Sequence, residues 1–189
     1  MRACRRRLWK PPHNNFMMIS PEPWLRGPLE GVPPHLMPLF HSFAQVREDL
    51  AHYTEGLTTE DVWRRTGALP SLGFHLRHIA HSVDRLVTYL CGDQLSDAQI
   101  ATLKQESEPG AVTLAELLAD IDEKLADAER RVRQIDAAML AEPRYIGKKR
   151  LPSTVLGLLV HVVEHTQRHL GQAITTAKLA RETHVKTGG

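Results

Sequence analysis

The sequence predicts an all-α fold, a four-helix bundle with one long crossover connection and a short extra helix. Aliphatic residues recur at alternating spacings of three and four in several long stretches, which is typical of helices packed in a bundle. Hydrophobic residues make up 42% of the 189 residues and aromatic ones only 5%, and strand-like alternation is nearly absent. We therefore expect one domain over residues 21–183, between a basic disordered tail (1–20) and a disordered end (184–189).

The long helices of this bundle have recognisable beginnings. Thr58 or Thr59 starts a short turn after the first helix, Ser96 precedes the connecting helix, and Thr113 forms a capping box with Glu116. The expected ranges are 35–57, 71–90, 113–135 and 152–181 for the long helices and 95–106 for the connecting one.

Two proline-containing segments flank the helices. Pro143 and Gly147 predict a loop before the last helix, and Pro152 predicts the first turn of that helix. In the segment 21–27, Trp24 and Leu25 are the large apolar residues, and we expect them to pack onto the bundle.

The charge is unevenly distributed along the chain. The net charge is +2, but the first ten residues alone carry +5, so residues 11–189 carry −3. This mildly acidic remainder argues against a nucleic-acid-binding surface. No run of about 18–20 apolar residues predicts a membrane span. Cys4 and Cys91 are the only cysteines, which favours a reducing cytoplasm and a metal site built from histidines and carboxylates.

The most informative segment is HVVEHTQRHLGQ, residues 161–172 in the expected last helix. His165 and His169 are four residues apart and therefore lie one turn apart on the same helix face. His161 lies one position off this face and either flanks the site or reaches solvent. Burial of unpartnered polar groups costs about 1–3 kcal/mol each, which predicts either hydrogen-bonded core histidines or a metal ion that binds the pair. The inward face comprises Val155, Leu158, Val162, His165, His169, Gln172 and Thr176.

A catalytic zinc site typically has three protein ligands, and the second helix offers three more histidines. At 100° per residue, His75 lies about 55° from the centre of the apolar face, His78 about 115°, and His81 almost opposite. Geometry alone favours His75, allows His78, and predicts His81 on the surface.

Two segments together resemble the motif of a known family. The first is HIAHS (78–82), which follows the helix start Ser-Leu-Gly, and the second is HTQRHLGQ (165–172). Over about residues 30–181 the chain resembles the DinB-like, or YfiT-like, four-helix bundle proteins. The resemblance implies that His78, His165 and His169 are the metal ligands and that His75 lies beside them or in the core. It also implies a homodimer.

Three neutral imidazole ligands do not offset the +2 charge of a divalent ion. That charge favours the deprotonated form of a bound water or thiol and so lowers its pKa. The resemblance implies a metal-dependent hydrolase or a transferase that uses a low-molecular-weight thiol such as bacillithiol or mycothiol. Zinc or nickel is favoured, and iron or manganese also suits such a site. The alternative is a non-enzymatic stress-response or binding module whose metal is structural or incidental.

Five further residues receive provisional roles. Glu164 and Gln172 are candidate catalytic residues, with a solvated helix residue and a bundle-closing amide as their respective alternatives. Asp84 and Arg85 are expected on a charged outer face, and Gly171 is expected to permit close helix approach. The expected partner is a small-molecule substrate.

Overall fold

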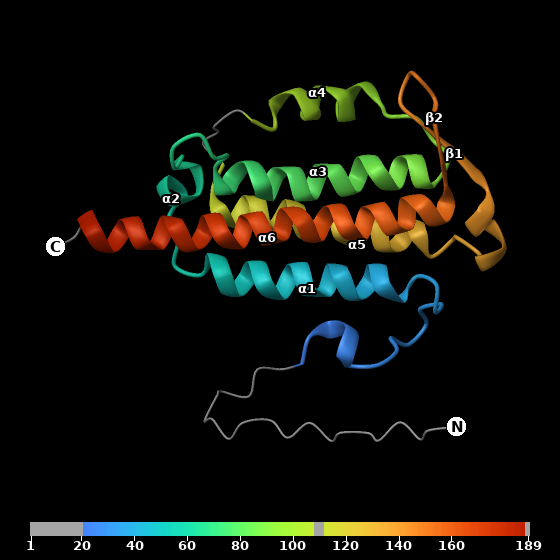
Figure 1. Cartoon of the computed structure of the whole chain (residues 1–189), viewed down its shortest axis with the longest axis horizontal. Helices are drawn as coiled ribbons and strands as arrows, with labels where there is room; N and C mark the ends of the chain where they lie inside the picture. The colour runs from blue at the N-terminus through green and yellow to red at the C-terminus, as the bar shows by residue number, and fades with distance from the viewer. Residues whose placement is uncertain (1–20, 108–111, 188–189) are drawn as a thin grey trace, which may run out of the picture.

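Figure 1 shows the computed structural model, which describes residues 21–107 and 112–187, with side chains described as far as residue 182. The expected basic tail (1–20) lies outside the described residues. The structure is mostly helical. Its long helices are α1 (Met37–Thr54), α3 (Leu72–Leu90), α5 (Leu114–Val132) and α6 (Val155–Thr187), and each packs against two of the other three.

Shorter elements precede the first long helix or connect the long helices. They are the 3-10 turns η1 (Pro23–Leu25) and η2 (Ala137–Ala141), the helices α2 (Thr59–Trp63) and α4 (Asp97–Gln105), and the strands β1 (Pro143–Ile146) and β2 (Leu151–Thr154). α4 lies on the outer side of α3 (Figure 1).

The expected helix starts are confirmed by side-chain caps. Thr58, Ser96 and Thr113 each cap the helix that follows, and all three form a capping box with the residue three positions on. Ser71 caps α3 by accepting a hydrogen bond from the backbone N–H of Phe74 at 3.2 Å. These contacts satisfy backbone donors that a helix end otherwise leaves unpaired.

The segment before α6 is a β-hairpin, so the prediction of a loop and of a helix start at Pro152 was wrong. β1 and β2 pair antiparallel, with Tyr145 opposite Pro152. The turn between them uses left-handed conformations at Gly147 (φ 65°) and Arg150 (φ 48°). α6 begins three residues later than expected because the Thr154 hydroxyl accepts the backbone N–H of Gly157 at 3.0 Å, a cap that proline has no side-chain oxygen to provide.

The core lies between the four long helices and is largely aliphatic. The apolar residues spaced three and four apart in the first two long helices are buried, except Leu86, which is partly exposed. The buried ones are Leu36, Leu39, Phe43, Val46, Leu50, Leu72, Leu76, Ile79, Val83 and Leu90. In α5 the same spacing predicts Leu118 as an inward residue, but Leu117 is buried and Leu118 only partly, so this part of the inward face is shifted by one residue. The C-terminal half of α6 contacts the core through the small, buried Ala173 and Ala177 and the partly buried Ile174.

Two expectations about packing were wrong. Trp24 and Leu25 are 62% and 57% exposed, because η1 buries Pro23 and turns the next two side chains outward. Arg26 instead links this segment to α1 through an ion pair with Glu48 at 2.5 Å. Gly171 is exposed, and an added Cβ there would meet no atom within 4 Å, so it does not mediate close helix approach.

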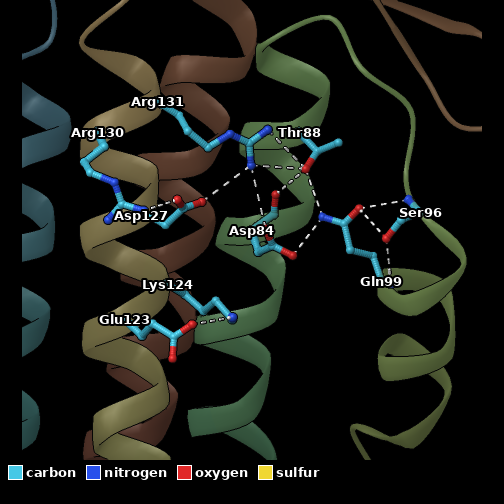
Figure 2. A network of polar contacts seen from close by, with 9 residues as sticks. All are labelled: Asp84, Thr88, Ser96, Gln99, Glu123, Lys124, Asp127, Arg130 and Arg131. Atoms are coloured by element: carbon cyan, nitrogen blue, oxygen red, sulfur yellow. Dashed lines mark hydrogen bonds and ion pairs between the residues drawn. The ribbon is translucent and has the colours of Figure 1, made fainter.

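α4 is attached to α3 by polar contacts, since none of its nine residues is buried. The Gln99 amide donates to Asp84 Oδ2 at 2.7 Å and to Thr88 Oγ1 at 2.9 Å (Figure 2). Arg131 of α5 donates to the same Thr88 hydroxyl at 3.4 Å. This network ties α4, α3 and α5 together, with Ile100 of α4 only partly buried.

Among the described residues, no helix has the length and apolar character that a membrane crossing requires.

Replacing Gly73 with alanine is expected to destabilise the protein. A Cβ at Gly73 would lie 2.5–2.7 Å from the Trp63 ring, which is held by a hydrogen bond from Nε1 to the Val112 carbonyl at 2.8 Å. Overpacking of this kind costs about 1–3 kcal/mol. Urea denaturation should show the loss in Gly73→Ala, whereas Gly171→Ala, at an open helical position, should gain up to about 1 kcal/mol. Equal stability of the two variants would contradict the close contact.

Candidate functional site

Three partly buried histidines from two helices form a cluster where these helices pack together. His78 belongs to α3, and His165 and His169 belong to α6. Each offers one ring nitrogen, and these three atoms lie within 4.8 Å of one another. His78 Nε2 lies 3.0 Å from His165 Nε2, and the ring centroids of His78 and His169 are 4.2 Å apart. The structure thus brings together the three residues that the resemblance implied as ligands.

The periodicity of α6 explains why two of these rings are neighbours. The spacing of four places His165 and His169 one above the other, with ring centroids 4.7 Å apart. The inward face does not continue through Gln172 as expected, because Gln172 is exposed and Ala173 is buried instead. The face drifts around the helix because 3.6 residues per turn do not fit a strict heptad.

Burial keeps the two α6 imidazoles neutral. It lowers the pKa of His165 to about 4, with a further contribution from the charge on His78. It lowers the pKa of His169 to about 4 in the same way, again with His78 as the next cause. Neutral imidazoles have a free lone pair, so both residues can bind a metal ion without first losing a proton at pH 7.

The donor set fits a divalent transition metal. At Zn–N distances of about 2.1 Å, two tetrahedral ligand nitrogens lie roughly 3.4 Å apart, and the His78–His165 separation of 3.0 Å is close to this. His169 Nδ1 is buried and has no hydrogen-bond partner among the described residues. Imidazole nitrogens suit zinc, nickel, iron and copper, so the donor set does not select one metal.

The three other candidate histidines, His75, His81 and His161, lie outside this donor set. His75 is 4% exposed, its ring centroid is 5.9 Å from that of His169, and burial followed by the charge on His78 lowers its pKa. His161 is half-exposed, and its Nδ1 lies 2.6 Å from Glu164 Oε1. The prediction of His81 on the surface was wrong, because its ring is partly buried and contacts Asp120 at 2.9 Å.

Glu106 and Arg85 are buried beside the cluster, and sequence reasoning missed both. Glu106 directly follows α4 and is 3% exposed, while Arg85 is 8% exposed, so the expected outer-face position of Arg85 was wrong. Glu106 Oε2 lies 2.7 Å from His78 Nδ1, and Oε1 accepts from Arg85 at 2.5 Å. The only sequence signal is that Arg85 follows His78 by seven residues, two turns along the same face of α3.

The acidity of Glu106 reflects these contacts. Burial acts to raise the pKa of its carboxyl, but hydrogen bonds from His78 and Arg85 outweigh this effect and bring the pKa below its ordinary value. Glu106 is therefore ionised at neutral pH and faces His78 as a carboxylate.

A groove of about 550 Å³ adjoins the histidine cluster. One part of its lining is apolar and comes from the start of α3 and the preceding segment, and the rest comes from α6. The lining residues are Leu69, Pro70, Phe74, His75, Arg168, His169, Gly171, Gln172, Thr175 and Thr176. An amphipathic groove beside potential metal ligands suits a small organic molecule with one polar end.

The two candidate catalytic residues occupy different surroundings. Gln172 lines the groove together with His169. Glu164 is not among the groove residues and contacts both His161 and Arg168. Burial acts to raise the pKa of Glu164, but hydrogen bonds from His161 and Arg168 outweigh it and lower that pKa below its ordinary value.

The stability of the metal-free protein should fall as the pH drops from about 6.5 to about 4. In this window the unfolded chain binds protons on His165 and His169, whose ordinary pKa is 6.5, while the folded protein does not. Urea denaturation in the presence of a chelator measures this decline. The variant His165→Gln/His169→Gln should show a shallower decline over the same range. An equally steep decline in that variant would show that these two rings are not the cause.

The comparisons with known proteins agree with the geometry. No curated protein matches the chain. Residues 42–173, more than half of the chain, match the family model of the DinB superfamily, and this region contains all three clustered histidines, Arg85 and Glu106. The chain therefore belongs to the DinB superfamily.

Proposed function

We propose that the chain is a divalent-metal-dependent enzyme in which His78, His165 and His169 bind the ion and a small-molecule substrate occupies the adjoining groove. The observation that carries this proposal is the convergence of three imidazole nitrogens within 4.8 Å beside a groove of about 550 Å³. Membership of the DinB superfamily supports it. The proposed reaction is hydrolysis or transfer of a low-molecular-weight thiol, and zinc or nickel is the proposed metal.

The proposed metal would supply Lewis acidity that lowers the pKa of a water or a thiol at the site. His169 and His75 both line the groove, so a molecule in the groove lies against the histidine cluster. Phe74, Pro70 and Leu69 exclude water from one side of that molecule. The described cysteine, Cys91, is exposed just beyond the far end of α3, so the thiol reaction uses an external thiol.

Gln172 and Glu164 receive different proposed roles. Gln172 is exposed in the groove, where its amide can donate to and accept from the polar end of a substrate. Glu164 acts through Arg168, whose guanidinium donates to its carboxylate and lines the groove. Its lowered pKa makes the Glu164 carboxylate a weak proton acceptor near neutral pH.

Two further features of the superfamily are proposed for this chain. We propose that α1, α3, α5 and α6 form its four-helix bundle, which the mutual packing of these helices supports. We also propose a homodimer, on the resemblance alone. Multi-angle light scattering tests this second proposal, and a monomer at micromolar concentration would contradict it.

The purified protein is expected to contain about one equivalent of a divalent metal, which elemental analysis measures. His78→Ala and His169→Ala should each lose it, because two imidazoles rarely retain a metal that needs three. His161→Ala is the matched control, since this half-exposed ring neighbours His165 but lies outside the donor set, and this variant should keep its metal. Wild-type protein without metal, or full retention in both ligand variants, would sink the proposal.

Removing the Gln172 side chain should weaken catalysis without loss of metal. A lost substrate hydrogen bond of ordinary strength, about 0.5–1.5 kcal/mol, corresponds to a roughly twofold to tenfold lower kcat/KM in Gln172→Ala. The measurement uses the first substrate found in a screen of hydrolysis and thiol-transfer reactions. Unchanged kcat/KM in this variant would remove Gln172 from the substrate site.

A further inference from the structure

Glu106 and Arg85 form a buried ion pair that the proposed reaction does not use. The Glu106 side chain is 3% exposed and that of Arg85 is 9% exposed. One carboxylate oxygen accepts from Arg85 at 2.5 Å, and the other lies 2.7 Å from His78 Nδ1. The hydrogen bonds of this carboxylate thus go to one arginine and one candidate ligand, and His81 Nδ1 lies 3.9 Å from Oε1, beyond hydrogen-bond distance.

Stability alone does not explain this arrangement. Removing two charges from water costs several kcal/mol per ion, and well-packed apolar residues often serve as well or better at such positions. α4 buries none of its own residues against the rest of the protein, yet the residue after it inserts a carboxylate into the interior. The position of Glu106 therefore points to a role at the histidine that it contacts.

The contact with Glu106 determines the tautomer and the orientation of the His78 ring. A ring that donates from Nδ1 to a carboxylate keeps the lone pair on Nε2. In His78, Nε2 is the atom that faces His165, at 3.0 Å. Phe74 stacks on the same ring, with centroids 5.5 Å apart and planes 17° from parallel. The carboxylate fixes the rotation and the tautomer of the ring, and the phenyl group restricts its plane.

We propose that Glu106 is a positioning residue that holds His78 with Nε2 directed at the histidine cluster, and that Arg85 holds the Glu106 carboxylate in place. This inference rests on the proposed metal site. Glu106 directly follows α4, which is attached to α3 through Gln99, Asp84 and Thr88 (Figure 2).

Metal affinity is the first test, measured on the full chain by competition between the protein and a fluorescent chelator for Zn²⁺. Loss of a carboxylate that orients a ligand histidine typically weakens metal binding about 10- to 100-fold. We expect a loss in this range for Glu106→Ala and a smaller loss, of about 10-fold, for Glu106→Gln, which keeps the side-chain volume and an accepting oxygen.

Asp120→Ala is the matched control, because it also removes a carboxylate from a histidine of α3. That histidine, His81, is not part of the clustered donor set, and its Nδ1 lies 3.9 Å from Glu106, too far for a hydrogen bond. Zinc affinity should therefore stay within about twofold of wild type. Circular dichroism melting shows whether each variant is folded. If Glu106→Ala does not fold, the zinc affinity of the isosteric Glu106→Gln variant decides the test.

The second test is independent of bound metal. Nitrogen-15 NMR of the histidine rings in the metal-free protein at pH 8 should show His78 as the Nδ1–H tautomer, and Glu106→Ala should shift it toward the Nε2–H tautomer. A role of Glu106 in packing alone would leave this signature unchanged.

The outcomes separate this inference from the proposed function. Absence of zinc binding by the wild type would overturn the metal site, and with it the role of Glu106 there. Zinc binding by the wild type, with both Glu106 variants within twofold of it, would overturn the positioning role and leave the metal site intact. Equal loss in Asp120→Ala would assign the effect to a general disturbance of α3 and would also overturn that role.

Discussion

Burial of neutral imidazoles between α3 and α6 is the constraint on which the rest of the site depends. The three rings are partly buried, and a polar atom there that faces the interior must find a partner within the protein or bind a ligand. The same burial lowers the pKa of His165 and of His169 to about 4, which leaves their lone pairs free. The free-energy cost of placing these rings in the interior thus creates the electron-pair donors that a metal requires.

The two halves of α6 contribute differently to stability and to the candidate site. Toward the start of α6, Val155, Leu158 and Val162 are buried among aliphatic residues of the other helices, and they contribute to the hydrophobic core. Beyond Val162 the buried residues of α6 are Thr166, Leu170 and then alanines, and the partly buried His165 and His169 lie beside them. The aliphatic end offsets the cost of the polar one, and natural proteins commonly tolerate such local cost at functional sites.

α4 fits this division because none of its residues is fully buried. It is attached through Gln99 and through the carboxylate of Glu106, which reaches the interior beside His78. A segment held by polar contacts is a weak source of stability. Its value to the protein lies in bringing a carboxylate to a ring that the long helices alone leave without a partner at Nδ1.

The sequence by itself determined the helical class, the helix starts at Thr58, Ser96 and Thr113, and the pairing of His165 with His169. These features are local: a capping side chain contacts backbone three residues away, and residues four apart share a helix face. Assigning His78 needed the family resemblance, because the angular argument alone favoured His75. Only the tertiary structure decided the contacts made by Arg85, Glu106 and His81 and the exposure of Trp24. Those depend on which helix lies opposite and where a connecting segment ends, and helical periodicity carries no information about either.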